Sequence, residues 1–257
     1  MNLAILSMKR TKQLLLSLVM TAITYTTCAQ KRDQILVFSK TAGFRHQSIE
    51  KGIQTIRELG QKNDFEVIAS EDAKLFTDDK LKKFKAILFL NTTGDLFNEQ
   101  QKSAFQSYIR QGGGFMGIHA ATDTEFNWPW YNQLVGAYFV NHPEVQEAKL
   151  IKTDAAHPAT EHLHQVWMHT DEWYNFKSIY PEIHPLLLLD ETSYSGGNNG
   201  KEHPITWYHD FDGGRSFYTG LGHTDESYDE NAFQQLLLGG INYAMGRKGP
   251  RFGVAPQ

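Results

Sequence analysis

Histidines with flanking glycine, proline or carboxylate residues recur along this 257-residue chain, and imidazole is the side chain best suited to chemistry near neutral pH. The five that stand in such segments are His46, His119, His142, His169 and His223. An imidazole can act as a base, an acid or a metal ligand, but it cannot form the thioester that a cysteine forms. The only cysteine is Cys28. Chemistry in the rest of the chain therefore has to use histidine, carboxylate, hydroxyl or a metal ion.

His119 follows the apolar run 115–118 and precedes two alanines, a pattern typical of a strand that ends in a sharp turn and pushes the next side chain into a cleft. We predict that His119 is a catalytic residue. His46 stands near the start of a predicted helix, which would lower its pKa and keep the imidazole neutral, as a base or a metal ligand needs. The alternatives are a core histidine bonded to backbone at position 119 and a solvated helix cap at position 46.

The segment His169-Thr-Asp-Glu-Trp-Tyr174 is the densest polar cluster in the sequence. In a strand, His169, Asp171 and Trp173 would share one face, while Glu172 and Tyr174 would share the other. Burying two carboxylates and a histidine costs free energy, which favours a functional role for them. We predict that His169, Asp171 and Glu172 are catalytic and that the two aromatic side chains bind substrate. The alternative is a solvent-facing edge strand, in which these polar side chains would not be buried and would carry no such cost.

Sequence spacing does not establish a metal site, because no pair of histidines forms a compact motif such as His-x-x-x-His. We still predict a divalent metal ion as the candidate cofactor, with His46, His142 and His223 as its ligands. Arg45 and Asp123 lie in the loops that carry His46 and His119, and we expect them to bind substrate. The remaining histidines are expected in loops or at the surface, namely His157, His162, His164, His184, His203 and His209.

Strands that alternate with helices must position these residues. Short apolar runs, each typical of a strand covered on both faces, occur at 34–39, 65–69, 86–90 and 115–118. Helical repeats follow at Ile49 to Leu59 and after Asn98, which can form a capping box with Gln101. The pattern predicts an α/β fold with a parallel sheet and helices on both faces. The site of such a sheet lies beyond the carboxyl ends of its strands, which here lead into loops 41–46, 91–95 and 119–123.

The second half of the chain has more aromatic residues and fewer helical repeats. It predicts additional antiparallel strands, followed by a closing helix at 231–245. The expected strands are 148–153, 166–174, 186–189, 205–211 and 215–220, the last two forming a hairpin. No internal repeat or linker is evident, so we predict one domain over residues 30–257.

Residues 1–29 are predicted to be a signal peptide, with a basic start, an apolar stretch at 14–23 and small residues before Gln30. The alternative is a lipoprotein anchored at Cys28. Both place the protein outside the cytoplasm, either periplasmic or secreted. We expect no transmembrane segment in the mature chain. A net charge of −4 without a Lys/Arg run argues against a nucleic-acid partner.

Four segments, in this order, resemble the ThuA-like, or trehalose-utilisation, family: Gly43-Phe-Arg-His46, Gly113 to Ala121, His169 to Tyr174 and Gly214 to His223. The resemblance covers residues 34–246. It implies a flavodoxin-like fold related to class I glutamine amidotransferases, with His119 at the turn where those enzymes carry cysteine. That difference removes amide transfer. The resemblance also implies a role in bacterial sugar utilisation, on disaccharides or glycosides oxidised to 3-keto forms.

These observations predict an exported enzyme that acts on a carbohydrate, a 3-keto-glycoside or related disaccharide, by elimination, hydrolysis or isomerisation. A ketone makes the neighbouring ring proton acidic, so a histidine base together with a group that polarises the carbonyl could drive any of these reactions. The alternative is a non-catalytic extracytoplasmic protein that binds a sugar with the same fold. A third reading is a cell-envelope protein whose histidines are structural.

Overall fold

Five short, mostly apolar strands form the parallel part of a nine-stranded sheet in the computed structural model, which describes residues 32–153 and 156–247. They are β1 (Asp33–Phe38), β2 (Phe65–Ser70), β3 (Phe84–Leu90), β4 (Gly114–Ile118) and β11 (Gly214–Thr219). Their order across the sheet is β2-β1-β3-β4-β11. The strand order reverses between β1 and β3, and ligand sites of such sheets lie beside this reversal.

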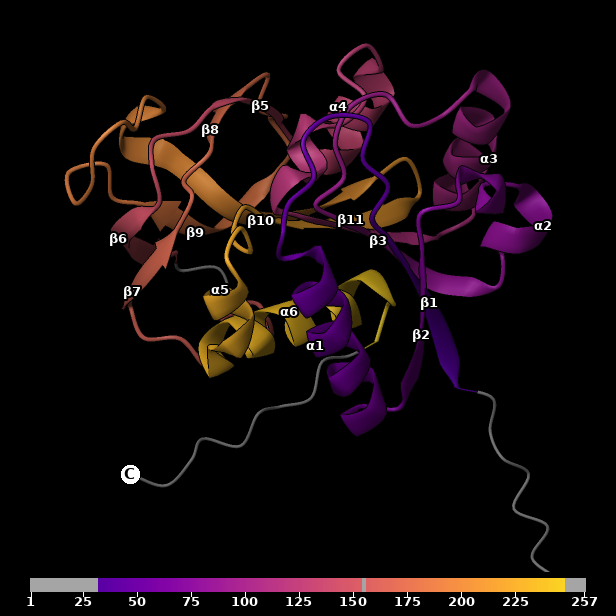
Figure 1. Cartoon of the computed structure of the whole chain (residues 1–257), viewed down its shortest axis with the longest axis horizontal. Coiled ribbons are helices and arrows are strands. Elements are labelled where there is room, and N and C mark those ends of the chain that lie inside the picture. The colour runs from indigo at the N-terminus through magenta and orange to yellow at the C-terminus, as the bar shows by residue number, and fades with distance from the viewer. Residues whose placement is uncertain (1–31, 154–155, 248–257) are drawn as a thin grey trace, which may run out of the picture. The chain divides into compact units, whose positions relative to one another are not determined.

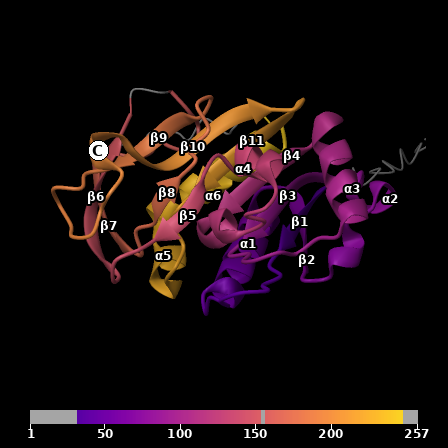
Figure 2. The same ribbon diagram turned by 90° about the horizontal axis from the view of Figure 1, so that it is seen from above.

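Helices cover both faces of this sheet, as the alternating pattern predicted (Figures 1 and 2). One face carries α1 (Ile49–Lys62), α5 (Asp225–Asp229) and α6 (Asn231–Ala244). The other carries α3 (Glu99–Arg110) and α4 (Pro129–Val135), with the short α2 (Asp78–Leu81) against α3. Short 3₁₀ helices lie at η1 (Ala73–Leu75), η2 (His119–Asp123) and η3 (Gly200–Glu202).

Antiparallel strands extend the sheet beyond β11, again as predicted. In sheet order they are β10 (His203–Phe211), β9 (His184–Leu189), β6 (Gln146–Lys152) and β7 (Val166–Asp171). A separate pair, β5 (Tyr138–Asn141) and β8 (Asn175–Lys177), forms a small antiparallel sheet. Figure 2 shows this pair beside α4, on the same face of the main sheet.

The predicted capping box at the start of α3 is present. The Asn98 side chain accepts a hydrogen bond from the Gln101 amide, and the Gln101 side chain accepts one from the Asn98 amide. Behind this cap, α3 packs on the sheet through Phe105, whose ring stacks on Phe89 of β3 with centroids 5.4 Å apart. Both rings are fully buried, and burial of such a side chain contributes about 1.5–3 kcal/mol.

Three details differ from the sequence prediction. The strand expected at 166–174 ends at Asp171, so the expected alternation of faces stops before Glu172. The short elements α2, α4, α5 and β5 were not predicted, because helices of four to seven residues and a four-residue strand carry little periodic pattern. His203 and His209, expected in loops or at the surface, are buried in β10, and His157 lies in a loop but is also buried.

The described residues all belong to one unit that begins at Arg32. The predicted signal peptide, with Cys28, lies outside the described residues. None of the helices in ranges 32–153 and 156–247 combines the length and the apolar character that crossing a membrane requires.

Candidate functional site

Three histidines and one glutamate converge where several strands end. His46 follows β1, His119 follows β4, Glu172 follows β7 and His223 follows β11. One donor atom from each lies within 4.8 Å of those of the other three. We call these four residues the histidine–glutamate cluster. It lies at the carboxyl edge of the parallel strands, the place expected for the site of this sheet class.

His119 occupies the sharp turn that the sequence predicted. Its φ of 48° lies in the left-handed region, which is uncommon for a residue other than glycine and marks local backbone strain. The hydroxyl of Tyr218 donates to the His119 carbonyl at 2.7 Å and so holds this turn. Nδ1 of the ring lies 2.8 Å from the Gly220 carbonyl oxygen, which can only accept. Nδ1 therefore carries the hydrogen, and the lone pair of Nε2 faces the cluster.

Nε2 of His119 lies 3.2 Å from Nδ1 of His223 and 3.4 Å from Oε2 of Glu172. Nδ1 of His223 lies 3.1 Å from the same Glu172 oxygen. These three polar atoms form a nearly equilateral triangle. Only the His223 side chain, about a quarter exposed, has substantial access to solvent, so the triangle lies just below the surface.

His46 completes the cluster from the first loop after β1. Its ring is 4.9 Å from that of His119 and 5.2 Å from that of His223, measured between centroids. Burial lowers its pKa to about 3, and the neighbouring His119 and His223 add to this shift. The imidazole is therefore neutral near pH 7. Its buried Nδ1 has no hydrogen-bond partner among the residues that the structure describes.

Glu172 links the cluster to the surface. Its Oε1 lies 2.9 Å from Nδ1 of His142, a half-exposed residue just after β5. Burial acts to raise the pKa of Glu172, but the neighbouring His119 and His223 outweigh this effect and lower the pKa. Burial likewise acts to lower the pKa of His223, and the bond to Glu172 reverses this and raises it. The carboxylate is therefore ionised, as metal binding or carbonyl chemistry requires.

Asp171 supports the cluster from behind. Its Oδ1 accepts from the amides of Glu172 at 2.9 Å and His223 at 3.0 Å, and its Oδ2 accepts from the Gly222 amide at 2.7 Å. The hydroxyl of Ser227 donates to Oδ2 at 2.9 Å. Burial acts to raise the pKa of Asp171, but these donors and the nearby imidazoles lower it. The fully buried Asp171 carboxylate thus fixes the backbone at Glu172 and His223, two of the cluster residues.

Gly222 is required in this arrangement. Its φ of 110° lies where side chains are strained, and a Cβ there would lie 2.8 Å from the Tyr228 hydroxyl oxygen. The glycine therefore lets the chain turn its amide toward Asp171 while His223 turns into the cluster.

His169 lies on the far side of Asp171 and does not join the cluster. Its Nε2 is 3.3 Å from Oδ2 of Asp171, and its Nδ1 is 2.6 Å from Oε2 of Glu230. Burial acts to lower the pKa of His169, but the two carboxylates raise it to about 9. His169 is held between two carboxylates, and Asp171 is held by backbone amides and Ser227. Neither residue belongs to the cluster. The catalytic roles predicted for them do not match this geometry, which instead gives them a positioning role.

The predicted substrate-binding residues have different surroundings. The Tyr174 ring lies 4.2 Å from the His119 ring. Asp123 is half-buried near His119. Burial raises the pKa of Asp123 to about 6, although His119 acts to lower it. Arg45 is exposed and pairs with Glu71 at 2.9 Å. Trp173 is fully buried and its indole N–H donates to the Gln146 carbonyl, so it has no free face for a sugar ring. Trp173 therefore belongs to the core, which corrects our expectation that it binds substrate.

Two supporting residues escaped the sequence analysis. Glu230, the acceptor for His169, is one of several acidic residues after His223, and nothing in their spacing distinguishes it. Asn91, fully buried and with a φ of 51°, donates to Ser48 at 3.0 Å and accepts from the Ala120 amide at 3.4 Å. It therefore joins the loops after β1, β3 and β4. Its place at the end of a predicted strand was the one available indication.

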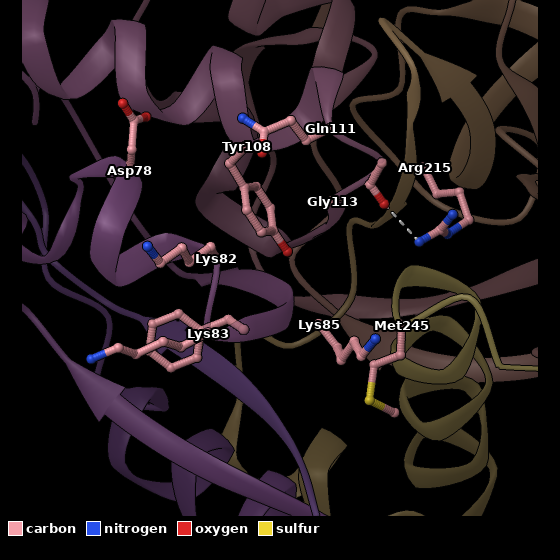
Figure 3. A pocket seen from close by; sticks show the side chains of 11 residues that line it. Asp78, Lys82, Lys83, Lys85, Tyr108, Gln111, Gly113, Arg215 and Met245 are labelled. Atoms are coloured by element: carbon pink, nitrogen blue, oxygen red, sulfur yellow. Dashed lines mark hydrogen bonds between the residues drawn. The ribbon is translucent and has the colours of Figure 1, made fainter.

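A basic pocket of about 280 Å³ lies away from the cluster, where β3, β4 and β11 begin (Figure 3). Its lining includes Lys82, Lys83, Lys85, Tyr108 and Arg215. The guanidinium of Arg215 donates to the Gly112 carbonyl at 3.0 Å and to carbonyls at the end of α6. Lys82 caps α2 and Arg215 contacts the last carbonyls of α6, so these two cations offset helix dipoles. No histidine lines this pocket.

The chain matches the family described as ThuA, trehalose utilisation, over residues 34–244. It belongs to the ThuA family. The match spans the cluster and every element that positions it. No curated protein matches the chain.

Solved structures of ThuA-like proteins share the fold. A ThuA-like protein from Bacteroides uniformis is similar with a TM-score of 0.72 and 22% identity, over 83% of this chain and 91% of that one. Another from Parabacteroides merdae has a TM-score of 0.70 and 20% identity, over 84% and 91%. A β-galactosidase from Bacillus circulans matches with a TM-score of 0.56 and 12% identity, over 84% of this chain but 31% of that one. The flavodoxin-like, class I glutamine amidotransferase-like fold predicted for this ThuA family member is confirmed.

Proposed function

We propose that this ThuA family member is a carbohydrate-active enzyme that acts on 3-keto-glycosides or related disaccharides by elimination, hydrolysis or isomerisation. The convergence of His46, His119, His223 and Glu172 within 4.8 Å at the carboxyl edge of the sheet carries the proposal. The family's description, trehalose utilisation, supports a role in sugar utilisation. The substrate and the reaction are our inference from the chemistry of the cluster.

The proposed chemistry begins at the proton on the carbon next to the ketone. A base takes this proton, and the electron pair moves into a carbon–carbon double bond while the carbonyl oxygen becomes an enolate. Collapse of the enolate expels the oxygen on the following carbon, which takes a proton from an acid; reprotonation at carbon instead gives isomerisation. Groups that stabilise the enolate oxygen lower the barrier, which is the task we assign to the cluster.

Two side chains at the open side of the cluster can move the protons. His142 is half-exposed and bonded to Glu172, so a proton can pass between solvent, imidazole and carboxylate. Asp123 is close enough to His119 for their charges to interact. We assign the acid and base roles to His142 and Asp123. The four cluster residues face one another, and Asp171 and His169 are already bonded to supporting groups.

Glutamine amidotransferase chemistry is excluded. The turn carries His119 in place of a nucleophilic cysteine, and the one cysteine of the whole chain is Cys28. The fold relation therefore extends to architecture and not to reaction.

Proton NMR of purified protein with a panel of glycosides and their 3-keto derivatives tests the proposal. We expect turnover of at least one keto-glycoside, reduced about 100-fold or more in His119→Ala and Glu172→Gln. His164→Ala, which changes an exposed histidine outside the site, is the matched control. Wild-type rates in both cluster variants would disprove the assignment. Sugar binding by calorimetry with no product from any compound would favour a sugar-binding protein instead.

We also propose that the protein acts outside the cytoplasm, after removal of residues 1–29. The basic start, the apolar stretch and the small residues before Gln30 support this. Mass spectrometry of the protein from cell fractions tests it: a chain starting at Gln30 in the periplasm or medium is expected. A diacylated chain starting at Cys28 would support the lipoprotein alternative, and an intact N-terminus in the cytoplasm would refute export.

A further inference from the structure

The distances inside the histidine–glutamate cluster match those between ligands of one metal ion. With metal–ligand bonds of about 2.0–2.1 Å, the donors around a tetrahedral ion lie about 3.3 Å apart. The measured separations are 3.1 Å, 3.2 Å and 3.4 Å among His223 Nδ1, His119 Nε2 and Glu172 Oε2. His46 lies against this triangle, with its donor atom within 4.8 Å of the others.

Hydrogen bonds on the outer side of His119 and Glu172 fix which of their atoms faces the cluster. The Gly220 carbonyl holds Nδ1–H of His119, and His142 holds the second oxygen of Glu172. Asp171 holds the backbone amides of Glu172 and His223. Partners of this kind orient metal ligands and raise their basicity.

His46 gives an independent indication. Its Nδ1 is buried and has no hydrogen-bond partner within the described ranges, and an unmet buried polar atom costs about 1–3 kcal/mol. The nitrogens of His119 and His223 also face each other at 3.2 Å. A cation that replaced the proton on His223 Nδ1 would give both nitrogens and the Glu172 carboxylate a common partner.

We infer that His46, His119, His223 and Glu172 bind one divalent first-row transition-metal ion of the zinc type. Three imidazole nitrogens and one carboxylate suit zinc, cobalt, nickel or iron, whereas magnesium and calcium prefer oxygen ligands. This inference deepens the proposed function and rests on it only for the task of the ion, which would be to stabilise the enolate oxygen from a further coordination position. Metal binding itself requires no substrate.

Cobalt titration tests the inference separately from any enzymatic activity. Purified full-length protein is treated with a chelator, dialysed, and titrated with Co²⁺ while visible absorption is recorded. We expect one ion per chain, with d–d bands that added Zn²⁺ abolishes. His46→Gln and Glu172→Gln should each weaken the apparent affinity by about 100-fold or more, beyond the roughly 10–100-fold of changes to outer partners. His164→Ala should bind as the wild type does.

Circular dichroism and a thermal melt of each variant identify any that has not folded, and His223→Asn then serves as a further ligand variant. Absence of visible bands at saturating Co²⁺ in the folded wild type would overturn the inference. Equal affinity in folded Glu172→Gln and wild type would also overturn it. Failure of every sugar in the NMR panel, with the cobalt result as expected, would refute the carbohydrate proposal and leave the metal site standing.

Discussion

Substitution of Asp171 by asparagine probes how the buried carboxylate supports the cluster. Asp171→Asn keeps the shape but replaces one acceptor oxygen by an N–H donor. The amide group fits best at the position of Oδ2, because Ser227 and a neutral His169 can both turn to accept from it. The Gly222 amide, now 2.7 Å from Oδ2, cannot do so and loses its partner.

One orphaned buried amide costs about 1–3 kcal/mol, and loss of the charged bonds adds about 1 kcal/mol. We therefore expect Asp171→Asn to lower the free energy of unfolding by about 2–4 kcal/mol at pH 7. Urea unfolding measures this from the shift of the midpoint, provided that the slope is unchanged. Ser227→Ala, which removes one neutral donor to the same carboxylate, should cost about 1 kcal/mol. A loss below about 0.5 kcal/mol in Asp171→Asn would refute the reasoning.

Three further predictions concern stability. His169, whose folded pKa is raised to about 9 from 6.5, contributes stability that is fully present below pH 6.5 and is lost as the pH rises through 9. The free energy of unfolding should fall by about 3 kcal/mol over this interval, and by less in Glu230→Gln. For the buried His157, burial lowers the pKa to about 4, so stability should be lost as the pH falls from 6.5 toward 4, and pH-dependent melts of His157→Asn should show a shallower acid limb. Asn98→Ala should cost about 1 kcal/mol in urea unfolding, because it removes the cap of α3; no change would show that the capping box is not stabilising.

The sequence predicted the parts of this fold that depend on local pattern. Apolar runs bounded by turns identified four of the five parallel strands, and the Asn98–Gln101 pair marked the start of α3. The fifth, β11, was expected only as half of an antiparallel hairpin, but it also pairs in parallel with β4. The rule that sites lie beyond the carboxyl ends of parallel strands led to the loops that carry His46 and His119. The turn at His119 was recognisable because an apolar strand led directly into a small-residue loop.

Features that depend on distant contacts were not predictable. The strand containing His169 ends at Asp171, whose carboxylate accepts hydrogen bonds from the amides of Gly222 and His223, some fifty positions away. Beyond this end Glu172 lies in the cluster and Trp173 in the core, and only tertiary contacts determine which side faces the site. Likewise, Glu230 acquires its part through tertiary contact alone.

Hydrogen exchange at the carbon next to the ketone tests the central claim most directly. Wild-type protein is incubated with 3-keto-glycosides in D₂O, and proton NMR follows loss of the signal from the acidic ring proton. We predict rapid exchange, slowed about 100-fold or more in Glu172→Gln and unchanged in His164→Ala. Exchange at the same rate in Glu172→Gln and wild type, or at the uncatalysed rate with wild-type protein, would contradict the claim that the histidine–glutamate cluster acts on such a sugar.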